Sequence, residues 1–197
     1  MKPLLAVIFL ITFSCSGLEV MSQIPDEKNK TFLSLEKAKE YALKGFNRHK
    51  WGYPKEFIQH MKDATVTEPL LVKRLDRKDS FYYIVPFNKD TKTTLIVIID
   101  AKTGAFKETS YMKEPMTYPK INKENAKNIL IVFLNDKKAT EEILRQEPTL
   151  VWKPSEQTQS PYEPLWEIHV GSKNWYIDQK GKVYDRIIEI RMKGGGN

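Results

Sequence analysis

The chain is poor in the residues that build most covalent and metal centres. Its 197 residues include one cysteine and three histidines. A single cysteine excludes an intrachain disulfide and a cysteine-based zinc site, and three histidines leave little material for a histidine-rich one. The motifs of serine hydrolases, zinc peptidases, phosphate-binding loops and dinucleotide-binding folds are missing too. We therefore expect a protein without enzyme activity, cofactor or metal.

Long apolar runs are equally scarce. The first, Leu4–Phe13, has ten residues, follows a basic start and precedes the small residues Ser14–Gly17. It is too short to cross a bilayer of ~30 Å as a helix, so it predicts a signal peptide over residues 1–14. The later runs, Leu95–Ile99 and Ile129–Leu134, have the length of buried elements.

The only cysteine, Cys15, directly follows this run. The segment Thr12–Cys15 resembles the lipobox of bacterial lipoproteins, with Thr12 where leucine is commonest. Because a lone cysteine in an exported chain has no disulfide partner, lipid attachment is a reason for its presence. We expect a membrane-anchored lipoprotein. Cleavage after Ser16, which would give a secreted or periplasmic protein, remains the alternative.

Charge of one sign is not concentrated enough to predict a nucleic-acid site. The net charge is +7, but basic residues alternate with acids, as in residues 73–79. Such a pattern is typical of a solvated surface, and a mild attraction to anionic lipid heads is compatible with it. Polar residues 15–32 predict a flexible tether, and residues 192–197 predict a disordered tail.

Between these ends, one order of elements occurs twice: two helices followed by four strands. Apolar stripes at helical spacing and caps at Ser34 and Asn122 indicate the helices, and β-branched and aromatic runs indicate the strands. The expected helices are Leu35–Asn47, Pro54–Lys62, Lys123–Asn135 and Lys138–Gln146, and the expected strands are Glu68–Lys73, Phe81–Phe87, Thr94–Asp100 and Ala105–Tyr111 in the first half and Glu147–Lys153, Leu165–Val170, Asn174–Asp178 and Lys182–Ile190 in the second.

This order predicts an α+β fold of two tandem units. Each unit would pack one or two helices on a four-stranded antiparallel sheet. The first unit would span residues 33–112 and the second 121–191. Residues 113–120 would link them, because two prolines there interrupt strand pairing.

A tight turn closes the third and fourth strands of each half. Asp100 and Asp178 can accept hydrogen bonds from backbone N–H groups there, and Gly104 and Gly181 can adopt positive φ. These are structural roles. The phrases Ile98–Phe106 and Tyr176–Tyr184 also resemble the core of PepSY-type domains.

That resemblance, covering about residues 33–190, implies a PepSY- or cystatin-like fold. It also implies a module that binds protein and that inhibits or escorts a secreted peptidase. We accordingly expect a protein partner in the cell envelope. The alternative is an envelope structural or assembly lipoprotein without a peptidase partner.

Two groups of side chains are candidates for function. Glu167 and His169 share one face of a strand, which would suit base chemistry or a metal, but a cross-strand ion pair or a solvent-facing position is the favoured explanation. Large aromatic residues cluster in the second half, beside the loop Pro154–Pro164, and could anchor a partner; they could equally fill the space between the halves. The candidate partner-binding residues are Trp152, Tyr162, Trp166, Trp175 and Tyr176.

Overall fold

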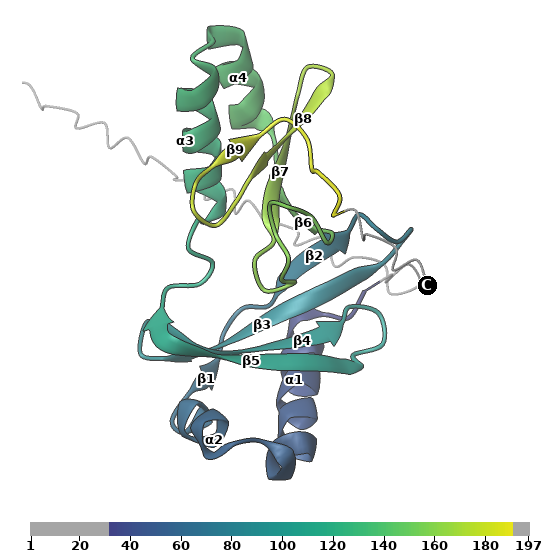
Figure 1. The fold of residues 1–197 in the computed structure, drawn as a ribbon, viewed down its shortest axis with the longest axis vertical. Helices are drawn as coiled ribbons and strands as arrows, with labels where there is room; N and C mark the ends of the chain where they lie inside the picture. Colours follow the sequence, from purple (N-terminus) through teal and green to yellow (C-terminus); the bar gives the residue numbers. More distant parts are fainter. Residues whose placement is uncertain (1–31, 191–197) are drawn as a thin grey trace, which may run out of the picture. The chain divides into compact units, whose positions relative to one another are not determined.

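The computed structural model describes residues 32–190, so the predicted signal peptide, Cys15, most of the tether and the tail lie outside the described residues. The described part is α+β, with four α-helices and a large, mostly antiparallel sheet, which confirms the predicted class (Figure 1). None of its helices is both long enough and apolar enough to cross a bilayer. The elements are α1 (Leu35–His49), η2 (Lys50–Gly52), α2 (Lys55–Met61), β1 (Thr65–Val66), β2 (Leu70–Arg74), β3 (Phe81–Lys89), β4 (Lys92–Asp100), β5 (Phe106–Met116), α3 (Lys123–Leu134), α4 (Lys137–Arg145), β6 (Thr149–Trp152), β7 (Leu165–Val170), β8 (Lys173–Ile177) and β9 (Val183–Tyr184).

Polar caps start three of the helices. The side chains of Ser34, Asn122 and Asp136 accept hydrogen bonds from the backbone N–H groups three residues ahead, at 3.4, 2.8 and 2.7 Å. These bonds satisfy donors that the first turn of a helix otherwise leaves free. Helix α3 ends at Asn135, whose left-handed conformation stops the helix there.

All nine strands belong to one sheet. Its order is β5-β4-β3-β2-β6-β7-β8-β9, and β1 pairs with β3. Strands β2 and β6 pair in parallel, with Val72 opposite Leu150 and Arg74 opposite Trp152, whereas all other pairs are antiparallel. We call this parallel pair the seam. The first strands of the two halves thus join in a single sheet, where the sequence predicted one sheet for each half.

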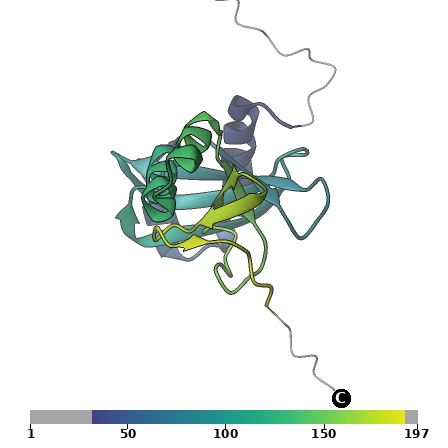
Figure 2. The same cartoon turned by 90° about the horizontal axis from the view of Figure 1, so that it is seen from above.

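Because β2 and β6 are parallel, the two pairs of helices cover opposite faces. Val72 and Leu150 lie on the same face, where they pack with α3 and α4 residues. Helices α1 and α2 pack on the other face of β3, β4 and β5; Figure 2 shows α3 and α4 in front of these strands. The α1-side core contains Ala38, Ala42, Phe46, Tyr83, Val85, Phe87, Leu95, Val97, Ile99 and Ala101, and the α3-side core contains Val72, Tyr82, Ile84, Ile96, Ile98, Ala126, Leu130, Ile143, Leu150, Trp152, Trp166, Ile168 and Ile177.

Most element boundaries agree with the prediction to within a few residues, and three differences are larger. Strand β5 continues to Met116, so the expected linker 113–120 begins inside a strand; Pro115 is tolerated because β5 is an outer strand. Strand β1 was not expected. Strand β9 is shorter than the predicted Lys182–Ile190, because the following residues bond to the 153–158 loop instead: the Glu156 N–H donates to the Ile188 carbonyl at 2.9 Å.

Candidate functional site

Two of the candidate binding aromatics, Trp152 and Trp166, are interior residues. Each side chain is only 7% exposed and belongs to the α3-side core. The Trp166 indole N–H donates to the Ile121 carbonyl at 2.7 Å. The expectation of a freely exposed aromatic surface therefore does not hold for these two rings, although Trp166 also lines a groove of the surface. Trp152 of β6 packs against Tyr82 of β3, and Trp166 of β7 is bonded to the segment before α3, so both rings fill the space where the halves meet.

Trp152 sits in an unusual polar setting. Its ring meets Tyr82 edge-on, with centroids 6.4 Å apart, and its buried indole N–H has no hydrogen-bond partner among residues 32–190. The Arg74 guanidinium lies 4.9 Å from the ring centroid. Asp76 holds that guanidinium through two bonds of 2.6 and 2.9 Å, and this pairing lowers the pKa of the Asp76 carboxyl.

Tyr162 and the loop Pro154–Pro164 are tied to the first half. The Tyr118 hydroxyl donates to the Tyr162 carbonyl at 2.7 Å, and the Tyr82 hydroxyl donates to the Pro161 carbonyl at 2.8 Å. Desolvation by burial raises the pKa of Tyr82, Tyr118 and Tyr162. The loop thus covers the α3-side core, and Tyr162 is half-buried rather than presented to a partner.

Trp175 and Tyr176 lie on opposite faces of β8. Trp175 is half-buried, and its ring meets Phe133 edge-on at a centroid distance of 5.7 Å. Tyr176 lies opposite Glu167 on the other face. Strand β9 pairs with β8 only at Tyr176 and Ile177, so the outer edge of the rest of β8 is not covered by a strand of the described chain.

The Asn174 side chain lies between Glu167 and His169, the pair considered for base chemistry. The His169 imidazole Nδ1 lies 2.7 Å from the Asn174 side-chain oxygen, and the Asn174 amide donates to Glu167 Oε1 at 3.1 Å. In residues 32–190 no group of three or more histidine, cysteine, aspartate or glutamate side chains is placed to hold a metal ion. The three side chains form a polar row along the surface of β7 and β8.

The two turn aspartates bind backbone N–H groups of their own turns. Asp100 Oδ1 accepts from Lys102 and Thr103 at 3.0 and 2.9 Å. Asp178 Oδ1 accepts from Lys180 and Lys182 at 2.8 and 2.9 Å. Gly104 and Gly181 follow with φ of 72° and 82°.

A groove at the seam was not predicted from the sequence. This seam groove has a volume of about 600 Å³ and lies where β2 and β6 begin. Its apolar wall includes Pro69, Leu71, Phe81, Pro148 and Trp166. The sequence did contain a signal for it. Each half has a Glu-Pro pair just before its seam strand, at 68–69 before β2 and at 147–148 before β6, and both prolines line the groove.

The rim of the seam groove carries charges of both signs. Glu68 and Glu167 lie on it, as do Lys73 and Lys123. The Lys123 ammonium binds the Glu147 carboxylate at 2.7 Å, and that bond raises the pKa of Lys123 and lowers that of Glu147. Because both groups are exposed, this pair adds little stability. An apolar wall with a rim that carries charges of both signs suits a ligand that has apolar side chains and a polar backbone.

Comparison with models of protein families, with curated proteins and with solved structures finds no match for this chain. The seam groove and the N-terminal sequence are therefore the features that indicate a function.

Proposed function

We propose that this chain is an exported binding protein of the cell envelope, held at the membrane by lipid on Cys15, which receives an extended segment of a partner protein in the seam groove. The observation that carries the proposal is the groove itself. Its volume of about 600 Å³ falls within the ~300–1,000 Å³ of typical ligand sites. Its apolar wall and charged rim match an extended peptide, whose side chains alternate between the wall and the rim.

We further propose that the two halves are tandem units of the PepSY type. Two equivalent contacts support this. Tyr41 is the seventh residue of α1, and a β-carbon on Gly104 would lie 2.6 Å from its ring. Ile129 is the seventh residue of α3, and a β-carbon on Gly181 would lie 3.4 Å from its methyl group. A helix position and a turn glycine thus meet in the same way twice, as duplication of one unit would produce.

The PepSY-type resemblance makes a secreted peptidase the proposed partner, inhibited or escorted by this chain. This step rests on analogy between folds. The partner's identity therefore decides between a module that inhibits or escorts a peptidase and an assembly lipoprotein.

The groove is tested by photo-crosslinking in intact cells. Leu71 lines the groove and is 37% exposed, whereas Val132 on α3 is 79% exposed and does not line it. A photoreactive residue at Leu71 should give one specific adduct that the same residue at Val132 does not give. Leu71→Arg should reduce recovery of that partner at least tenfold, and Val132→Arg should leave it unchanged. Equal adducts at both positions would overturn the proposed site.

Lipid attachment has its own test. Metabolic labelling with a fatty-acid analogue should mark the chain, and Cys15→Ser should abolish the label and release the protein from membranes. Unchanged labelling of the Cys15→Ser variant would contradict the anchor without touching the groove.

A further inference from the structure

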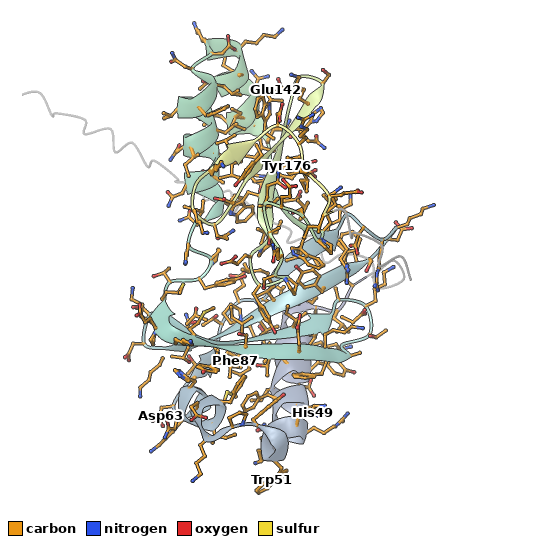
Figure 3. The ribbon with its side chains drawn as sticks, viewed as in Figure 1. His49, Trp51, Asp63, Phe87, Glu142 and Tyr176 are labelled. Atoms are coloured by element: carbon orange, nitrogen blue, oxygen red, sulfur yellow. The ribbon has the colours of Figure 1, made fainter. Side chains whose placement is uncertain are left out.

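The turn between α1 and α2 carries three basic side chains close together in the sequence. Residues 47–55 contain Arg48, Lys50 and Lys55 and no acid. All three cations are exposed, and none of them forms a salt bridge within residues 32–190. Glu56, in the first turn of α2, is the acid that follows directly in the sequence, and Asp63, beyond the end of α2, lies away from this turn (Figure 3). The local charge is therefore available to an anionic partner.

Trp51 stands at the centre of this basic turn. Its side chain is 89% exposed, the highest value among the large exposed hydrophobic residues of the described chain. Figure 3 shows it at the tip of the turn, pointing away from the helices. The Lys50 ammonium lies 5.3 Å from the ring centroid. Leaving so large an apolar surface in water is unfavourable, which makes the exposed ring informative.

The base of the turn is packed, so Trp51 is held outward. The Tyr53 ring packs on Phe46 and on Phe57, both with centroids 5.2 Å away. Phe46 is 1% exposed and belongs to the α1-side core. The chain thus buries the aromatic rings on either side of Trp51 and leaves this one out.

We infer that this turn, which we call the Trp51 turn, is a second membrane contact that binds an anionic bilayer surface. Tryptophan prefers the headgroup level of a bilayer, because its ring is apolar and its N–H is polar. Each lysine or arginine near an anionic leaflet contributes attraction, and stable anchoring generally takes a lipid chain plus a basic patch.

The inference rests on the proposed export and lipid attachment for its setting, but not on the seam groove. A fully extended segment between Cys15 and Thr31 reaches about 55–60 Å. Helix α1, which separates residue 35 from the Trp51 turn, has 15 residues and is therefore about 22 Å long. A chain anchored at Cys15 can therefore bring the Trp51 turn to the same membrane.

The test uses fluorescence of the full chain on vesicles. The signal of Trp51 is the difference between the chain and its Trp51→Phe variant. With phosphatidylglycerol vesicles whose acyl chains carry bromine, this signal should shift to the blue and lose at least half its intensity. With phosphatidylcholine alone, or in 1 M salt, the quenching should fall at least threefold. The double variant with Lys50→Gln and Lys55→Gln should reduce the quenching by brominated phosphatidylglycerol as much as 1 M salt does.

The matched control places a tryptophan elsewhere on the same attached molecule. In the Trp51→Phe background, Val132→Trp should not be quenched, because residue 132 lies on α3 and away from the turn. Equal quenching at 51 and 132, quenching that ignores lipid charge, or no attachment to vesicles would each overturn the inference. A blue shift with inorganic polyphosphate, without quenching by brominated lipid, would assign the turn to a soluble polyanion and overturn it too. Because crosslinking at Leu71 is measured separately, the inference and the groove can fail independently.

Discussion

Gly104 and Gly171 are both in the left-handed region, with φ of 72° and 64°, but only one of them touches a helix. A β-carbon at Gly104 would lie 2.6 Å from the Tyr41 ring, whereas at Gly171 it would meet nothing within 4 Å. A side chain at Gly171 would meet backbone strain alone, whereas a side chain at Gly104 would meet backbone strain and crowding by the Tyr41 ring.

Gly171→Ala is expected to cost about 1–2 kcal/mol of unfolding free energy, from backbone strain alone. Gly104→Ala should cost about 1–3 kcal/mol more, because the tyrosine ring must move. Urea unfolding of both variants measures this, and adding Tyr41→Ala should recover part of the extra cost at Gly104 only. Equal losses for the two glycine variants would mean that α1 is not held against the turn.

Acid should weaken the turn at Asp100. Burial alone would raise the pKa of its carboxyl, but hydrogen bonds from Thr103 and Lys102 outweigh it, so the pKa is lowered. The unfolded chain then binds more protons than the folded one below the usual aspartate pKa of about 3.9, so this contribution is present above that pH and is lost as the pH falls. Asp100→Asn should lower stability at neutral pH and flatten the acid limb of a stability-versus-pH curve. An unchanged acid limb would assign acid sensitivity to other carboxyls.

At the scale of elements, the neighbouring strands β6 and β7 carry two buried indoles that differ in hydrogen bonding. The N–H of Trp166 is bonded to the Ile121 carbonyl, and the N–H of Trp152 is buried without a partner in the described part of the chain. An unsatisfied buried donor costs about 1–3 kcal/mol. The two rings are equally buried, so they form a matched pair.

Trp166→Phe should therefore destabilise the protein by more than Trp152→Phe, by about 1–3 kcal/mol, since only the first loses a bond and frees a buried carbonyl. Thermal unfolding of the two variants gives the comparison. Truncation to alanine should cost about 3–5 kcal/mol at either site, because both are core. If Trp166→Ala removed partner binding with little loss of stability, the ring would belong to a binding surface after all.

At the scale of the whole described chain, the α3-side core joins both halves. Ile84 and Ile96 come from the first half and pack in one cluster with Leu130 and Ile168 of the second. Separating the halves would expose all of them. The two halves should therefore unfold together, even though their elements repeat.

Calorimetry should show one transition for residues 32–190. Leu130→Ala on α3 should cost about 2–5 kcal/mol and should lower hydrogen-exchange protection in β3 and β4 as well as in β7. Loss of protection confined to the second half, or two resolved transitions, would indicate independently stable units.

The elements with local signals could be predicted from the sequence. The caps Ser34 and Asn122 and the apolar stripes behind them determine where α1 and α3 begin, and β-branched runs determine β4 and β7, because these preferences act over a few residues. The turns at Asp100 and Asp178 are local in the same sense. The Trp51 turn is also readable as a basic stretch with one tryptophan, but its 89% exposure is not.

Only the tertiary structure decided which rings are free and where a groove lies. The side-chain alternation of a strand says that Trp166 and Glu167 face opposite ways, but not which face is covered. That choice follows from the parallel pairing of β2 with β6, which puts α3 over Trp166 and leaves the Glu167 side open beside the two prolines of the seam groove. Pairing between strands almost eighty residues apart depends on packing of the whole core, and no local pattern encodes it.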